Sequence, residues 1–169
     1  MALYLLQNGA AGTTAAPVAV TTGTAIKTLI QFKPSATIAA KIVEWGISFD
    51  GSAAATPGKV ELMESDVAAT VTALAAADIT KYDGDALAGG DPTTNLIQVG
   101  TTSTGFTASS EGTTTVSRMF DLQLLPPTGP YVKQFPLGRE PILQVGKFAR
   151  IRVTFGTAIN AYCYMIVSI

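Results

Sequence analysis

Alternation of apolar and polar residues is the strongest pattern in this chain, and it predicts β-strands. The segments 118–125 (RMFDLQLL) and 148–155 (FARIRVTF) alternate, the first from Phe120 to Leu124 and the second from Ala149 to Phe155. The segment 43–49 also alternates and stops at a turn pair, and its apolar face is made of Val43, Trp45, Ile47 and Phe49. The final segment 161–169 (AYCYMIVSI) is apolar on both faces, which is typical of a central strand or of one covered by a partner.

Weaker strands are predicted at five further places, namely 2–7, 26–32, 59–64, 95–99 and 131–135. Glycine and proline turns separate many of them. Many short strands at this spacing predict an all-β fold, and we expect one domain over 1–169. Its expected form is a β-sandwich of jelly-roll type, with about eight strands and long loops. The alanine-rich segment 65–79 predicts at most one short helix, or else an ordered excursion from the sheets.

Two segments have the composition of binding loops. Residues 80–115 are rich in glycine, threonine and serine and read as long loops around a weak strand. We expect an extended N-terminal segment, 1–25, to take part in partner contacts, together with the loops of 83–115. Within these loops, Asp83, Asp85 and Asp91 offer oxygen ligands for a cation, but their spacing departs from that of an EF-hand loop. An Asp- and Gly-rich turn is the alternative reading.

Composition and charge narrow the possible functions. The 169 residues include only 14% charged side chains, and the net charge is −1, so no basic field exists to hold nucleic acid. No segment approaches 18 consecutive apolar residues, so we expect no membrane span. The single cysteine, Cys163, excludes an intrachain disulfide, and its apolar surroundings predict a buried, inert thiol.

Catalytic chemistry has few candidates in this sequence. Histidine is absent, which excludes Ser–His and Cys–His pairs, and no phosphate-binding glycine loop or nucleophile elbow is present. Paired carboxylates such as Glu61, Glu64 and Asp121 leave a glycosidase as a remote alternative, against the commoner reading of solvated acids. We therefore expect a protein that is not an enzyme and uses no cofactor.

Four charged residues are candidates for an interface. Arg139 and Glu140 lie side by side in PLGREPI (136–142), where two prolines and a glycine predict a stiff corner between strands. We expect this pair to form a clasp between strands or subunits, and an exposed, solvated pair is the alternative. Arg150 and Arg152 project from the polar face of their strand, either to contact a partner or as a solvated or ion-paired face.

Several stretches together resemble the head decoration (cement) proteins of tailed bacteriophages and related small virion proteins. They are LYLLQNG (3–9), TTAAPVAVTTGTAIKTLIQF (13–32), VEWGISFDGSAAATPGKVEL (43–62) and QFPLGRE (134–140), with 69–115 matching least well. The resemblance implies a sandwich or jelly-roll domain that is often trimeric and binds over capsid subunits. It thus implies a major capsid protein as partner, a homo-oligomer with a trimer favoured, synthesis in the host bacterial cytoplasm and a place on the capsid surface.

A carbohydrate-binding module on a virion or cell surface is the main alternative. It would need exposed aromatic side chains, for which Tyr82, Phe106 and Tyr131 are the candidates. Trp45 lies on the apolar face of its strand, where core packing is the favoured role over a sugar-stacking platform.

Overall fold

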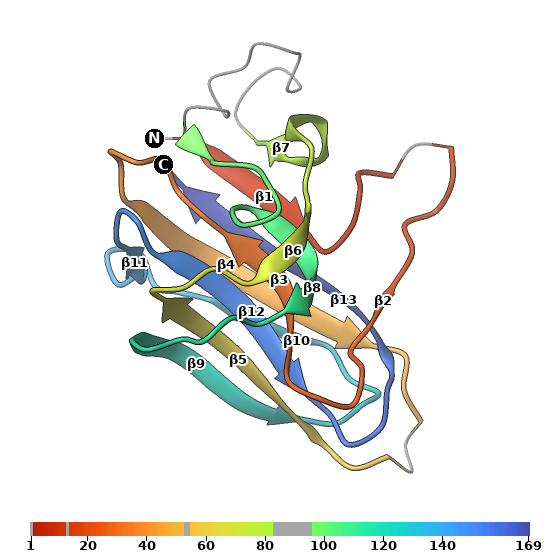
Figure 1. Ribbon diagram of the computed structural model, residues 1–169. Helices are drawn as coiled ribbons and strands as arrows, with labels where there is room; N and C mark the ends of the chain where they lie inside the picture. The colour runs from red at the N-terminus through yellow and green to blue at the C-terminus, as the bar shows by residue number, and fades with distance from the viewer. Residues whose placement is uncertain (1, 13, 53–54, 83–95) are drawn as a thin grey trace.

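Two antiparallel β-sheets lie face to face in the computed structural model (Figure 1). The structure describes residues 2–12, 14–52, 55–82 and 96–169. The side chains between the sheets form one core around Trp45, Phe32 and Ile151. The chain ends lie side by side, because Ala2 and Ile169 exchange two backbone hydrogen bonds of 2.8 and 3.1 Å.

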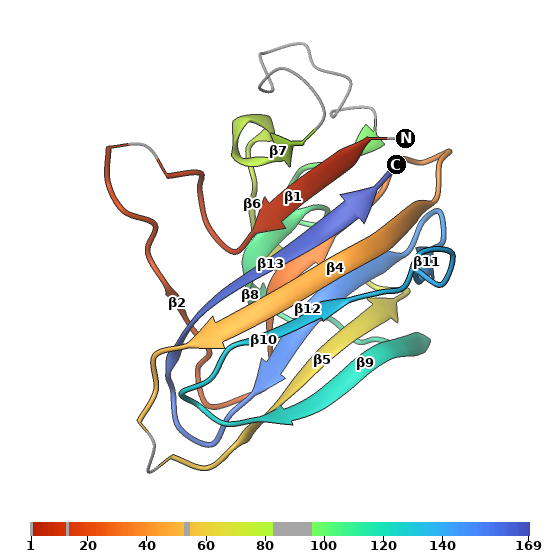
Figure 2. The same ribbon diagram turned by 180° about the vertical axis from the view of Figure 1, so that it is seen from behind.

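The first sheet has the strand order β10-β4-β13-β1-β7, and two short strands pair at its margins, β11 with β4 and β2 with β13. Its strands are β1 (Leu3–Gln7), β2 (Val20–Thr21), β4 (Ala40–Phe49), β7 (Thr80–Lys81), β10 (Tyr131–Gln134), β11 (Ile142–Leu143) and β13 (Asn160–Ser168). Seen from behind, this sheet faces the viewer (Figure 2).

The second sheet has the order β6-β8-β3-β12-β5-β9. Its strands are β3 (Lys27–Phe32), β5 (Gly58–Ser65), β6 (Thr70–Ala73), β8 (Gly105–Ser110), β9 (Ser117–Leu125) and β12 (Phe148–Thr154). The all-β sandwich predicted from the sequence is therefore confirmed. The described residues contain thirteen strands and not about eight, partly because β2, β7 and β11 have only two residues each. The jelly-roll path stays a prediction.

The alternating segments form strands as predicted, but in β4 the phase of burial changes within the strand. In β12, Ala149, Ile151 and Val153 are fully buried, as expected. In β4, however, Ile42 is buried in place of Val43. The pairing with β13 explains the difference, because Val43 is an extra residue at a bulge between the Ile42 and Glu44 pairs.

The final strand, β13, is central in its sheet, as its apolar sequence predicts. It pairs with β4 on one side and with β1 on the other. The Cys163 thiol on this strand is buried, and burial raises its pKa well above the ordinary value. A buried thiol of this kind is a poor nucleophile, which agrees with the inert role predicted for it.

The alanine-rich segment 65–79 does not form an α-helix. Its centre is the strand β6, and only Ala76–Asp78 form a single 3₁₀ turn, η1. The β-branched residues Thr70, Val71 and Thr72 favour the strand, in which Val71 is buried and pairs with β8. The weak strand predicted at 95–99 is reduced, over its described part, to isolated bridges at Ile97 and Val99. Within the described residues, no helix is long and apolar enough to cross a membrane.

Candidate interaction surfaces

The corner 136–142 is a tight turn that projects between β10 and β11. The Arg139 N–H donates to the Pro136 carbonyl oxygen over 2.9 Å, and Gly138 has a φ of +81°. A positive φ at the third residue of a four-residue turn is the requirement of a type II turn, which glycine meets without strain. The residue before it, Leu137, is 92% exposed. The predicted stiff corner is present, and a leucine stands at its tip.

The two charged residues of the corner have different surroundings. The Glu140 carboxylate is mostly buried and lies 3.7 Å from the Lys41 ammonium on β4. Backbone N–H groups of Glu140 itself and of Gly138 lower the pKa of this carboxyl, with a further contribution from Lys41. Glu140 thus holds the corner against β4.

Arg139 is exposed, and its guanidinium has no hydrogen-bond or ion-pair partner among the described residues. The expected partner of Arg139 within the domain is therefore absent among the described residues. A partner across a subunit boundary stays a prediction, and so does the alternative of an exposed, solvated side chain.

Arg150 is not a surface residue, although its strand position predicted one. Its side chain is fully buried, and Nη1 donates to the Glu111 carbonyl oxygen over 3.0 Å and lies 3.5 Å from the Glu111 carboxylate. Nη2 donates to the carbonyl of Val67. Burial lowers the Arg150 pKa, and Glu111 opposes that effect. The predicted interface role is wrong for Arg150, because the loops around Val67 and Glu111 cover it.

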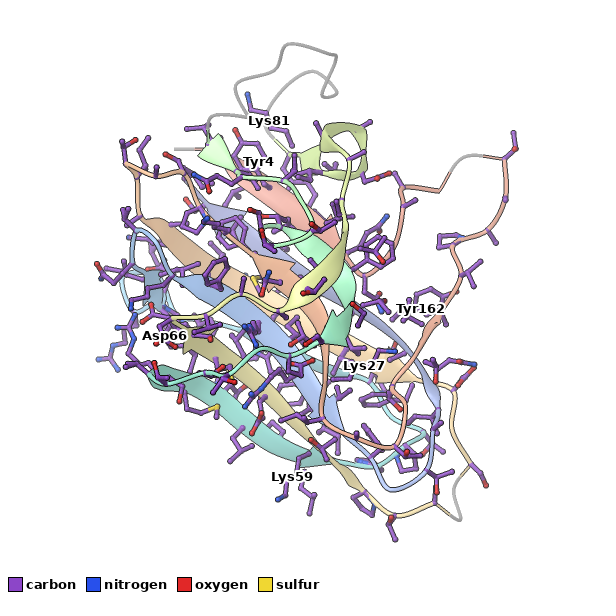
Figure 3. All side chains as sticks on the ribbon, viewed as in Figure 1. Tyr4, Lys27, Lys59, Asp66, Lys81 and Tyr162 are labelled. Carbon is purple, nitrogen blue, oxygen red and sulfur yellow. The ribbon has the colours of Figure 1, made fainter. Side chains whose placement is uncertain are left out.

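Two carboxylates fix the loops that cover the second sheet. Glu111 accepts hydrogen bonds from both the N–H and the hydroxyl of Thr28, over 2.5 and 2.6 Å. Asp66, which follows β5 and is labelled in Figure 3, accepts from the hydroxyl and the N–H of Thr115 and from the N–H of Val116. These bonds, that of the Thr115 hydroxyl first, lower the Asp66 pKa to about 2.

Arg152 belongs to one of two cross-strand ion pairs of β5, which lie on opposite faces of the second sheet. It pairs with Glu61 directly opposite on β5, through Nη2 and Nε at 2.7 and 3.0 Å. Arg118 on β9 pairs with Glu64 in the same way, over 2.7 Å. Direct cross-strand charge pairs contribute roughly 0.2–1 kcal/mol each. The ion-paired alternative for Arg152 is confirmed.

After the bulge at Phe120, the edge strand β9 turns Leu122 and Leu124 outward and Asp121 inward. Leu122 and Leu124 are 55% and 66% exposed, and Met119 adds to the same surface. Among the described residues β9 pairs only with β5, so no strand covers its other edge (Figure 2), although the Leu122 N–H donates to the Asp121 carboxylate over 3.0 Å. We call Met119, Leu122 and Leu124 the β9 edge.

Asp121 explains why this strand is turned over. Its buried carboxylate accepts from the Tyr131 hydroxyl over 2.9 Å and from the Gln123 amide over 2.8 Å, and the Lys133 ammonium lies 3.3 Å away. Burial by itself raises the Asp121 pKa, but the bonds from Gln123, Tyr131 and Lys133 outweigh it and lower the pKa. A bulge at Phe120 shifts the phase of the strand at this point.

A groove of about 330 Å³ lies on the outer face of the first sheet. Its lining is mostly apolar and contains no charged side chain, and includes Pro17, Val18, Pro130, Val132, Tyr162 and Tyr164. The Tyr162 hydroxyl donates to the Pro17 carbonyl oxygen over 2.5 Å and so ties the β1–β2 loop to β13 (Figure 3). The Tyr164 hydroxyl donates to Glu44 over 2.6 Å, and its ring lies against Gly46.

The predicted N-terminal contact segment, 1–25, divides into two parts. β1 lies between β13 and β7 and is part of the sheet. The described part of the β1–β2 loop projects beyond the sheets (Figure 1) and is held at Ala11, whose N–H donates to Asp78 over 2.8 Å, and at Pro17 by Tyr162. This loop is the part of 1–25 that projects furthest toward a partner.

The aromatic and metal candidates have mixed outcomes. Trp45 is fully buried in the core, as predicted, and Tyr131 packs against it with ring centroids 5.3 Å apart. Phe106 is half-buried and Tyr82 is 52% exposed, while no pattern in the sequence predicted that Tyr162 would be 45% exposed. Asp83, Asp85 and Asp91 lie outside the described residues. Elsewhere in the described chain, no group of three acidic or cysteine side chains is placed to hold a metal ion.

The three acids considered for a glycosidase each have a cationic neighbour. Glu61 pairs with Arg152, Glu64 with Arg118 and Asp121 with Lys133. A general acid of a glycosidase needs a raised pKa, whereas the Asp121 pKa is lowered. What the described residues offer is a set of surfaces: the corner, the β9 edge and the groove.

No protein-family model, no curated protein and no solved structure matches this chain. The fold is therefore established by the structure alone, and the likeness to decoration proteins stays a resemblance between stretches of sequence.

Proposed function

We propose that this chain is a non-enzymatic structural protein of a tailed-bacteriophage virion, a decoration protein that oligomerises and binds the outer surface of the head. The sequence resemblance over 3–62 and 134–140 suggests this class. Its partner is then the major capsid protein, and its place is the capsid surface, after synthesis in the host cytoplasm.

The observation that carries the proposal is the β9 edge. Natural proteins usually protect an outer strand with charges, prolines or a covering segment, because an exposed apolar edge promotes association. A bulge and an inward-turned acid also interrupt such edges, and β9 has both, at Phe120 and Asp121. Leu122 and Leu124 nevertheless face outward, and two large apolar side chains left exposed on an outer strand are best explained by a partner that covers them.

Burial of the β9 edge gives a measurable share of the affinity. Full burial of a leucine side chain contributes about 1.5–3 kcal/mol. Leu122 and Leu124 have 55% and 66% of their surface left to bury, so the two together contribute about 2–4 kcal/mol. Since 1.4 kcal/mol corresponds to a factor of ten, their loss weakens binding by more than tenfold.

Co-sedimentation tests the proposal. Purified protein is mixed at micromolar concentration with phage heads that lack it, and the pelleted fraction is measured. We expect the parent to pellet with the heads and the double variant Leu122→Lys/Leu124→Lys to need at least tenfold more protein. Ile26→Lys is the matched control, because Ile26 is 44% exposed at a distance from β9. If the parent protein stays in the supernatant, the proposed binding to phage heads is wrong. If the double variant pellets like the parent, the β9 edge does not take part in binding.

A carbohydrate-binding module is the second candidate, and the groove favours it. Tyr162 and Tyr164 both line this uncharged groove, and tyrosine offers an apolar ring with a polar tip. The three aromatics expected from the sequence give less support, since Tyr131 is committed to Trp45 and Asp121. Binding of the protein to a glycan array would favour this candidate, and an array without hits would remove it.

A further inference from the structure

Two features of the molecule lack a protein contact within the described part of a single copy. One is Leu137, an almost fully exposed leucine at the tip of a rigid turn, with the Arg139 guanidinium, which has no partner among the described residues, two residues away. The other is the uncharged groove on the outer face of the first sheet. Pro130 and Val132 at the start of β10 line the groove, whereas the turn follows the end of β10. An extended strand advances about 3.3 Å per residue, so the tip cannot fold back into its own groove.

We propose that copies of this chain associate head to tail, with Leu137 of one copy seated in the groove of the next and Arg139 of the first paired with Glu44 of the second. This interface deepens the proposed function, which includes an oligomer, and it names the surfaces that form that oligomer.

Shape and polarity favour the insertion of Leu137. The groove is open to solvent on an otherwise regular sheet face, and its lining is largely apolar, so that a leucine entering it exchanges water for apolar contacts. The type II turn fixes the backbone that presents the leucine, and a rigid knob loses little conformational freedom on binding.

Charge complementarity fixes the partner as a second copy. Glu44 lies on the same outer face as the groove, two residues before Gly46 on β4. The ring of Tyr164, which lines the groove, lies against Gly46. The Glu44 carboxylate accepts from the Tyr164 hydroxyl, and no cation pairs with it in the described part of the chain. The Arg139 guanidinium near Leu137 and the Glu44 carboxylate near the groove therefore carry opposite charges, and the geometry of an Arg–carboxylate pair orients such a contact.

The geometry of the contact sets the kind of assembly. The knob and the groove are different surfaces, so the contact is heterologous, and a heterologous contact closes into a ring when its rotation allows. The trimer implied by the sequence resemblance is such a ring. A twofold dimer through one shared patch is not.

Charge reversal with rescue tests the interface in the absence of phage heads, by light scattering on a size-exclusion column. We expect the parent at about three times its chain mass of 17.5 kDa. Arg139→Glu raises the dissociation constant at least tenfold, and Arg139→Glu/Glu44→Arg restores the oligomer. Lys59→Glu, an exposed charge reversal on the other sheet, is the control and leaves the mass unchanged.

A mixing experiment separates the two halves of the contact. Leu137→Asp removes the inserting leucine and keeps the groove open, whereas Ser48→Trp fills the groove and keeps Leu137. Each variant alone is expected to be monomeric, and a mixture of the two forms a complex, because one intact knob meets one intact groove.

A parent that is monomeric at 100 µM, variants that keep the mass of the parent, or a charge reversal without rescue each overturns the interface. None of these measurements contains phage heads. A failure here therefore leaves the co-sedimentation result to decide the proposed function separately.

Discussion

Removal of the Glu111 carboxylate is the sharpest test of how the loops are held over the second sheet. Glu111→Ala leaves the fully buried Arg150 guanidinium without the carboxylate that it contacts among the described residues and takes away the acceptor of both Thr28 hydrogen bonds. Breaking a buried ion pair at one partner costs about 3–5 kcal/mol. Because the Glu111 side chain keeps 21% of its exposure, we expect the lower end, about 3 kcal/mol.

Urea and thermal unfolding measure this loss. For a chain of this length, 1 kcal/mol shifts Tm by about 2–4 °C, so Glu111→Ala should lower Tm by roughly 6–12 °C. Glu111→Gln should fall between the parent and Glu111→Ala, since an amide oxygen still accepts from the Thr28 N–H. Glu61→Gln is the control, because Arg152 keeps 16% of its exposure whereas Arg150 keeps none, and because an amide oxygen still accepts from Arg152, so this substitution should cost about 1 kcal/mol. If Glu111→Ala and Glu61→Gln destabilise equally, the buried network does not hold the loops as described.

Two further predictions concern the core and the sandwich edge. Gly58→Ala should lower the free energy of unfolding by about 1–3 kcal/mol, because a Cβ at this position would lie 2.4 Å from the buried ring of Phe155. Gly9→Ala is the control and should not destabilise, because the space around Gly9 is open. Equal effects of the two substitutions in urea unfolding would contradict this packing. The lowered pKa of Asp121 predicts stability that is fully present above the unfolded-state pKa of about 4 and is lost as the pH falls through the lower folded-state value. Urea unfolding from pH 7 to pH 2 should therefore show a smaller acid loss in Asp121→Asn than in the parent, and identical pH profiles would refute this.

Periodicity predicted most of the strands but not which face of β9 is buried. A period of two is the same whether the polar or the apolar face is turned inward, and burial of the apolar face is only the usual outcome. In β9 the polar face is inside because Tyr131, Lys133 and Gln123 satisfy the Asp121 carboxylate. Two of those three partners lie on β10, in the other sheet, and no local pattern in the sequence announces them.

The charged candidates show the same limit at longer range. The prolines and glycine of the corner correctly predicted a tight turn, since each restricts or frees its own backbone. The fate of the charges depended on segments far away in the sequence: Lys41 for Glu140, and the loops at Val67 and Glu111 for Arg150. The sequence did not predict the groove either, because residues from five separate segments line it.

The central claim is that this chain binds the outer surface of a phage head, and imaging tests it most directly. Heads that lack the protein are incubated with it, and their reconstruction by electron cryomicroscopy is compared with that of bare heads. We predict additional density at fixed points of the outer lattice, into which the sandwich fits with the β9 edge against the shell. Reconstructions that are identical with and without the protein, at concentrations well above micromolar, would contradict the claim.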